Sequence, residues 1–319
     1  MEHEREDGTA IASTLRMSSL PASASDVADG LRATGYLPGE STALVAFLAT
    51  QLGKPILVEG PAGVGKTELA KAMAAFLGRD LVRLQCYEGL DEAKALYEWN
   101  YRKQLLRIQA ESTPGTAGEA GGRGWQEVQD DIFGREFLLS RPLLQAISSE
   151  QPVVLLIDEI DKTDQEFEAM LLELLSDFQI SIPELGTVRS TSHPVVLLTS
   201  NNTRELTEAL KRRCLYLWLD YPSLDHELEI VRLHTPELPE TVARKLVELV
   251  ALVRDLDLKK PPSIAESIDW ARALLLLGAQ DIDQDTFRQT MSVIVKHRTD
   301  LDVVAERVGV KLTLGAPAA

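Results

Sequence analysis

The segment from residue 60 to residue 67 constrains the fold of this chain more than any other. It reads Gly-Pro-Ala-Gly-Val-Gly-Lys-Thr, which matches G-x-x-x-x-G-K-[ST], the pattern of a phosphate-binding loop. Glycines let the backbone curl so that successive N–H groups point at a phosphate, and the N-terminal end of the following helix attracts the same anion. The pattern therefore predicts a strand, this loop and a helix in succession.

The flanking residues supply that context. Residues 54–58 form a short apolar run typical of a strand, and a helical pattern extends from Thr67 to Leu77 and stops at Gly78. A dinucleotide-binding fingerprint is excluded, because Glu68 stands where the third glycine of G-x-G-x-x-G is required.

We therefore predict a nucleoside triphosphate site. Lys66 is expected to reach the β- and γ-phosphates, and the Thr67 hydroxyl is expected to bind Mg²⁺. The residues expected to line the nucleotide are Gly60, Pro61, Ala62, Gly63, Val64, Gly65, Lys66, Thr67 and Glu68.

Two adjacent carboxylates follow a second buried strand. Residues 153–157 are all apolar, and Asp158 and Glu159 come directly after them. A carboxylate at the end of a buried strand can hold the Mg²⁺ of a bound triphosphate, and a second one can activate the attacking water. The alternative is that both residues only cap the helix that follows. Together with the phosphate loop they favour Asp158 as Mg²⁺ ligand and Glu159 as catalytic base.

Polar residues also follow a third apolar strand, residues 194–199. A side-chain amide there can hold the attacking water or the γ-phosphate, and we prefer Asn202 to Asn201 for this role. The alternative is a turn, for which asparagine is a common choice.

A basic triplet, Lys211-Arg212-Arg213, stands before the next strand, residues 215–219. Cations at the end of a helix oppose its dipole and are usually solvated. An arginine at a subunit edge can instead complete the site of a neighbouring subunit, a role that requires an oligomer. Either Arg212 or Arg213 could act in this way.

The order of the predicted elements gives the fold class. Strands and helices alternate as far as residue 220, which is typical of an α/β domain with a mostly parallel sheet. After residue 220 only helical spacing is found, so a separate helical domain is predicted. We expect a loose tail over 1–30, a nucleotide-binding core over 31–220 with a flexible insert at 111–124, and a helical domain over 221–319.

Charge and cysteine content narrow the function classes. The 319 residues include 33 Lys and Arg against 49 Asp and Glu, a formal charge of −16, which disfavours broad binding to nucleic acid or anionic lipid. The longest apolar runs are far shorter than the ~20 residues of a membrane span, and the acidic N-terminus is unlike a signal peptide. Two cysteines suit a reducing compartment. We expect a soluble, cytoplasmic protein that neither crosses membranes nor binds nucleic acid.

These motifs, taken in their order along the chain, resemble those of an AAA+ ATPase. The finer pattern is similar to the MoxR family, through Gly35-Tyr36 and the residues 52–55, 58–70 and 219–222. Residues 199–205, 213–216 and 268–272 resemble the CoxD branch of that family, whose members serve carbon monoxide dehydrogenase maturation.

The resemblance implies an α/β core with a parallel five-stranded sheet and a smaller all-α lid. It implies a homo-oligomeric ring, usually a hexamer, with ATP and Mg²⁺ between subunits. Asn202 would be the first sensor, Arg213 the finger acting in trans, and Tyr36 part of the nucleotide site. It further implies a von Willebrand factor A-type partner and a client metalloenzyme that the ATPase remodels or supplies with metal.

One departure from the family pattern concerns the lid. Family members carry a second-sensor arginine at the start of a lid helix, but residues 260–266 contain none. Lys259 or Lys260 could substitute for it. Two alternatives to a maturation motor stay open at this point: a nucleic-acid-directed motor of the restriction or helicase-loader type, and an ATP-bound assembly switch that scarcely hydrolyses.

Overall fold

The computed structural model describes residues 20–111, 134–183 and 185–313. Contacts divide the chain into two compact units, one formed by residues 1–59 and 67–217, the other by residues 60–66 and 218–319. The division at residue 218 lies close to the expected boundary at 220, but the phosphate loop clusters with the helical unit. The predicted insert at 111–124 lies outside the described residues except for Glu111, which ends a helix.

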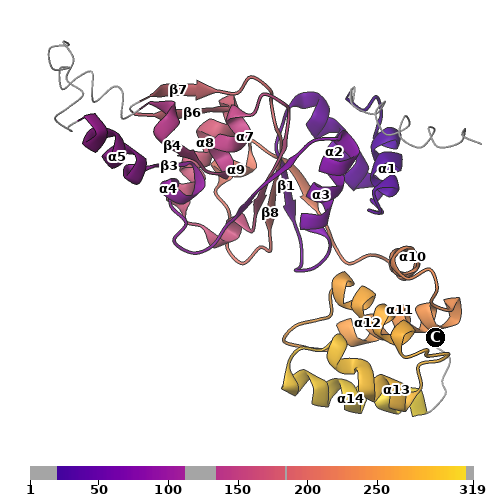
Figure 1. The fold of residues 1–319 in the computed structure, drawn as a ribbon. Coiled ribbons are helices and arrows are strands. Elements are labelled where there is room, and N and C mark those ends of the chain that lie inside the picture. The colour runs from indigo at the N-terminus through magenta and orange to yellow at the C-terminus, as the bar shows by residue number, and fades with distance from the viewer. Residues whose placement is uncertain (1–19, 112–133, 184, 314–319) are drawn as a thin grey trace, which may run out of the picture. The chain divides into compact units, whose positions relative to one another are not determined.

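The first unit is built on a five-stranded sheet with the order β2-β5-β8-β1-β9 (Figure 1). The predicted α/β class with a parallel sheet is confirmed, since β2–β5, β5–β8 and β8–β1 all pair in parallel. The central strands are buried along their whole length because helices cover both faces. The strands are β1 (Ile56–Glu59), β2 (Leu81–Gln85), β5 (Val154–Asp158), β8 (Val195–Ser200) and β9 (Leu215–Trp218).

Helices flank this sheet, with α2 and α3 on one side in Figure 1 and α7 and α8 on the other. Two antiparallel pairs complete the described part of the unit, β3–β4 and the hairpin β6–β7. The α-helices are α1 (Ala24–Ala33), α2 (Glu40–Leu52), α3 (Lys66–Leu77), α4 (Glu92–Ala95), α5 (Tyr101–Glu111), α7 (Pro142–Ser148), α8 (Gln165–Asp177) and α9 (Glu208–Lys211). The remaining elements are β3 (Tyr97–Trp99), β4 (Leu138–Ser140), β6 (Gln179–Ile182), β7 (Gly186–Arg189), and the 3₁₀ turns η1 (Arg135–Phe137) and η2 (Ile160–Lys162).

The predicted tail is wrong where the structure describes it. Residues 24–33 form α1, which begins at a complete capping box in which the side chains of Ser23 and Asp26 satisfy each other's backbone N–H groups. Val27 and Leu31 are fully buried. The sequence pattern does not reveal this helix, because these two residues are its only large apolar residues in a polar stretch. Residues 1–19 lie outside the described part of the chain.

From residue 219 onward, the described part of the second unit contains helices and no strands, as the spacing predicts. Its core is centred on Trp270, which packs edge-to-face against Phe287 at 5.8 Å between ring centroids. The elements are α10 (Leu224–His234), α11 (Glu240–Arg254), α12 (Ile264–Leu276), α13 (Gln284–Thr290), the 3₁₀ turn η3 (Met291–Val293) and α14 (Arg298–Thr313). None of the helices in the described ranges is long and apolar enough to cross a membrane.

A buried ion pair braces this unit. Arg254 on α11 donates two hydrogen bonds to the carboxylate of Glu227 on α10, at 2.5 and 2.8 Å, and its Nε donates to the Pro262 carbonyl at 2.7 Å. Ser267 on α12 donates to the same carboxylate at 2.7 Å. Because the buried charge has all these partners, its desolvation is compensated. The brace fixes α10, α11 and the segment that leads into α12.

Candidate functional site

The glycine-rich segment lies between β1 and α3, so the predicted strand, loop and helix are confirmed. Gly63 and Gly65 have φ angles of +77° and +97°, where a side chain would be strained. A Cβ at Gly60 would lie 1.9 Å from the Leu219 carbonyl oxygen, so this position has no room for a side chain. The ammonium of the buried Lys66 donates to the carbonyls of Gly60 and Pro61, both at 2.7 Å, and so lies across its own loop.

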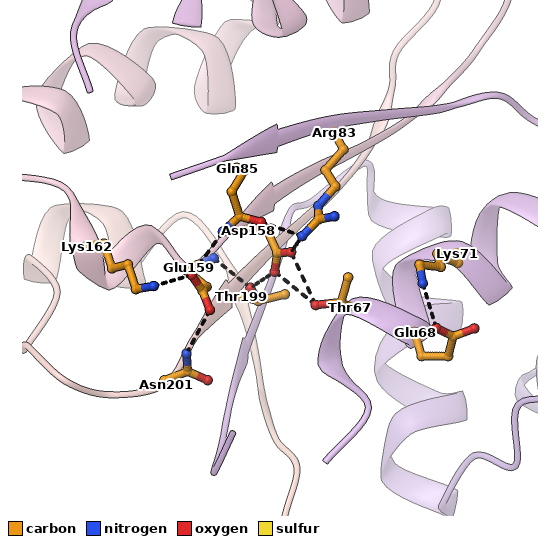
Figure 2. A network of polar contacts seen from close by, with 10 residues as sticks. All are labelled: Thr67, Glu68, Lys71, Arg83, Gln85, Asp158, Glu159, Lys162, Thr199 and Asn201. Atoms are coloured by element: carbon orange, nitrogen blue, oxygen red, sulfur yellow. Dashed lines mark hydrogen bonds and ion pairs between the residues drawn. The ribbon is translucent and has the colours of Figure 1, made fainter. Parts of the chain in front are cut away.

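The first unit brings Asp158, at the end of β5, to the first turn of α3. The Thr67 hydroxyl donates to Asp158 Oδ1 at 3.1 Å, and the Thr199 hydroxyl donates to the same oxygen at 2.5 Å (Figure 2). Asp158 is 2% exposed. A hydroxyl beside a buried carboxylate is an oxygen donor set of the kind that Mg²⁺ prefers. The residues present therefore fit the metal expected with a nucleotide.

Arg83 on β2 was missed by sequence reasoning. Its Nη2 lies 2.5 Å from Asp158 Oδ2 and also contacts the Gln85 amide oxygen. Side chains alternate along β2, which places Arg83 and Gln85 on its exposed face, and Gln85 is in register with Asp158. That alternation was the available signal, but only the pairing of β2 with β5 shows what these side chains reach.

Glu159 is held by side chains from several elements (Figure 2). Gln85 donates to Glu159 Oε2 at 3.0 Å, the Lys162 ammonium lies 2.5 Å from the same oxygen, and Asn201 Nδ2 lies 3.4 Å from Oε1. The Glu159 backbone has φ +59° and its N–H donates to Thr199 Oγ1 at 2.9 Å. Left-handed backbone at a residue other than glycine costs about 1–3 kcal/mol and is concentrated at functional sites.

The alternative reading of Glu159 as a helix cap finds no support in its contacts. Glu159 occupies the N-cap position of η2, but its side chain makes no hydrogen bond to the backbone of that turn. The carboxylate instead faces Gln85, Lys162 and Asn201.

The structure brings Asn201, and not the preferred Asn202, to this carboxylate. Asn202 is exposed and has φ +57°, and its backbone N–H donates to the Ser200 hydroxyl oxygen at 3.0 Å. Asparagine tolerates this conformation better than most residues. Asn202 thus has the role of a turn residue, and the turn directs the preceding side chain at Glu159.

Buried acids anchor the segment after Asn202. Asp161 accepts from the backbone N–H and hydroxyl of Thr203 at 3.0 and 2.6 Å. Glu168 on α8 pairs with Arg204 at 2.6 Å and accepts from the Thr207 hydroxyl at 2.6 Å. These contacts tie the segment to η2 and α8, which fixes the turn at 201–202.

The predicted nucleotide residue Tyr36 lies near the first turn of α3. Burial raises the pKa of the Tyr36 phenol well above its ordinary value, and the negative charge of Glu68 adds to the rise. Glu68 itself pairs with Lys71 at 2.9 Å. The structure thus places Tyr36 close to the helix that carries Thr67.

The pKa of the buried Cys86 thiol depends on the nearby carboxylates. Burial, and in addition the negative charges of Asp158, Asp161 and Glu159, together raise the pKa of Cys86 to about 12. A cluster that disfavours one more negative charge is suited to a cation.

The two candidate finger arginines follow α9 and differ in their contacts. Arg213 is half-buried, and it donates from Nε to Ser176 Oγ at 2.6 Å and from Nη1 to the Ala209 carbonyl at 2.9 Å. Arg212 is the exposed C-cap residue of α9. Neither belongs to the network around Asp158 and Glu159 (Figure 2).

Known proteins share part of this sequence. A family model described as AAA domain (dynein-related subfamily) matches residues 55–214, which is half of the chain. The chain is 24% identical over 217 residues to the gas vesicle ATPase GvpN1 of Halobacterium salinarum, covering 64% of this chain and 57% of that protein. It is 32% identical over 146 residues to the chaperone protein ClpB 2 of Parasynechococcus marenigrum, covering 44% of this chain and 13% of that protein.

The chain thus spans little more than half of the gas vesicle ATPase and a small part of the ClpB protein. Among solved structures, a mutant of RuvB from Thermotoga maritima aligns with a TM-score of 0.49 at 17% identity, over 80% of this chain and 68% of that chain.

Proposed function

Because the chain belongs to the AAA domain family, dynein-related subfamily, we propose that it is a Mg²⁺-dependent ATPase that works as a ring-shaped motor or chaperone. The observation that carries the proposal is the meeting of Thr67, Asp158 and Glu159 at the ends of β5 and β8. A hydroxyl and a buried carboxylate for Mg²⁺ stand there beside a second carboxylate that other side chains hold in position.

Each residue of the site has its own role in ATP hydrolysis. The N–H groups of the glycine-rich loop and the Lys66 ammonium bind the phosphates, and Thr67 and Asp158 hold the Mg²⁺. Held by Thr67 and Asp158, Mg²⁺ would supply positive charge against the negative charge that develops during hydrolysis. Glu159 orients the attacking water and accepts its proton. Asn201 donates its amide toward the same place and is the first sensor in this proposal.

We expect the neighbouring asparagines to respond differently to substitution. Asn201→Ala should lower kcat for ATP by about 10- to 1,000-fold, because it removes a positioned donor beside Glu159. Asn202→Gly should leave kcat within about twofold, because glycine adopts φ +57° freely. Steady-state phosphate release measures both. The opposite ranking of the two variants would return the sensor role to Asn202.

Arg213 is the proposed finger that completes the site of a neighbouring subunit. We expect the ATPase rate per subunit to rise with protein concentration, and an Arg213→Ala chain mixed into the wild type to lower its rate by more than dilution explains. Arg212→Ala, mixed in the same way, is the matched control and should only dilute. Sizing with and without ATP measures the ring, for which a hexamer is proposed. A constant rate per subunit from a monomer would contradict catalysis in trans.

We also propose a class of client and a class of partner protein. The resemblance at residues 199–205 and 268–272 supports a MoxR-type ATPase of the CoxD-like branch, acting in the cytoplasm on a client metalloenzyme with a von Willebrand factor A-type partner. We expect such a partner, taken from the genomic neighbourhood, to raise the ATPase rate when added in purified form. An unchanged rate over a titration of the partner would count against this assignment.

A nucleic-acid-directed motor is the competing proposal. The formal charge of −16 argues against it, since phosphate backbones are held by Lys and Arg. The ATPase rate should therefore be the same with and without DNA or RNA.

A further inference from the structure

The glycine-rich loop touches the start of α12 within the second unit. A Cβ built at Gly63 would lie 2.3 Å from the Cβ of Ser263 and 2.7 Å from its hydroxyl oxygen, which is far inside van der Waals contact. Residues 60–66 belong to the same compact unit as residues 218–319. The backbone of the loop therefore lies directly against the N-cap residue of α12.

Ser263 is rigidly attached to the helical unit. It is 6% exposed, its N–H donates to Glu266 Oε2 at 2.7 Å, and its hydroxyl contacts the same carboxylate, which completes the capping box of α12. The Pro262 carbonyl before it accepts from Arg254, which is itself braced by Glu227. A displacement of Ser263 thus moves α12 together with the brace.

The segment that leads into α12 carries no arginine, and Lys260 contacts Glu266 in the cap of α12. The Lys260 ammonium lies 3.3 Å from Glu266 Oε1, where it supports the cap of α12. At Gly63, the close contact of the loop with the helical unit is made by Ser263, an uncharged side chain.

We propose that Ser263 is a positioning residue that couples the phosphate loop to the helical unit by steric contact at Gly63. The inference rests on the proposed function in one respect, namely that the loop binds ATP. Binding of phosphates selects one conformation of the loop, and the contact transmits that choice to α12, because a ligand shifts a conformation only through contacts that differ between states. Gly63 is glycine for two reasons: its positive φ, and the lack of space for a Cβ against Ser263.

Amide hydrogen exchange of α12 tests the coupling. In the wild type, Mg²⁺ and the non-hydrolysable analogue AMP-PNP should slow exchange in a peptide covering residues 260–270 by about fivefold or more. Ser263→Gly should reduce that factor to about twofold or less, although glycine is nearly as good an N-cap as serine. The matched control is Ser223→Gly at the N-cap of α10, which should leave the factor unchanged.

A pair of substitutions tests the contact itself. Gly63→Ala should weaken AMP-PNP binding by about tenfold or more, because the new methyl group overlaps Ser263. Adding Ser263→Gly removes the Cβ that the new methyl group would meet, and AMP-PNP binding should improve by about threefold or more. Recovery should be partial, because alanine stays strained at φ +77°. Fluorescence titration with a labelled analogue measures all affinities.

The outcomes separate the coupling from the proposed function. A wild-type chain that binds no AMP-PNP with Mg²⁺ would overturn the ATPase proposal and the coupling together. The coupling alone would be overturned by a different result: the wild type binds and hydrolyses ATP, but AMP-PNP slows amide exchange at residues 260–270 as much in Ser263→Gly as in the wild type. The coupling would also be overturned if Ser263→Gly did not improve AMP-PNP binding in the Gly63→Ala background.

Discussion

Glu159→Gln should lower kcat for ATP hydrolysis by about 100- to 10,000-fold, the usual contribution of a positioned general base. Glutamine has the same shape. Gln85 and Asn201 donate to different oxygens of the Glu159 carboxylate, so the single amide oxygen of glutamine can still accept from one of them. The ion pair with the exposed Lys162 is lost at a cost of at most about 1 kcal/mol. ATP affinity and the fold should therefore survive while turnover does not, and phosphate release beside a binding titration measures this separation.

The control for this substitution is Glu166→Gln, the same chemical change at an exposed position in the first turn of α8. It should leave kcat unchanged. A Glu159→Gln chain that still hydrolyses at the wild-type rate would remove Glu159 from catalysis. If that chain loses turnover but supports the biological role in a deletion strain, the protein is an ATP-bound assembly switch rather than a motor.

Lys66→Met should strongly weaken the binding of ATP. The ammonium is buried, and it makes charge-assisted hydrogen bonds to loop carbonyls that the phosphates of ATP would replace. Such bonds contribute about 1.5–3 kcal/mol each, so ATP affinity should fall about 100-fold or more. Methionine fills a similar volume without leaving a buried charge, which keeps the thermal midpoint near that of the wild type.

Lys71→Met is the matched control, because Lys71 lies on the same helix, is exposed, and pairs with Glu68. Its ATP affinity should stay within about twofold of the wild type, as expected for an exposed ion pair. If Lys66→Met binds ATP as tightly as Lys71→Met does, then the loop is not the phosphate site.

Local patterns were enough to predict the sheet and the centre of the site. The glycine-rich loop is contiguous in sequence, and its neighbours must be a strand and a helix. Asp158 and Glu159 were found because they follow an unbroken apolar run, and the carboxyl ends of parallel strands meet at one edge of the sheet. These inferences needed only residues close to one another along the chain.

The differences between the sequence predictions and the structure have equally specific causes. Helix α1 was missed because Val27 and Leu31 are its only buried residues in a segment rich in small polar ones. Asn202 was preferred to Asn201 because adjacent asparagines are indistinguishable in a pattern. The backbone at Asn202, with φ +57°, decides which amide reaches Glu159.

The class of fold, the phosphate loop and the two carboxylates follow from the sequence alone, because each depends on short-range periodicity or on a contiguous motif. Only the tertiary structure decided that Arg83 and Gln85 reach those carboxylates, and that Ser263 lies against Gly63. Such contacts join residues far apart in the chain, and their partners depend on strand register and helix packing, which a single sequence does not specify locally.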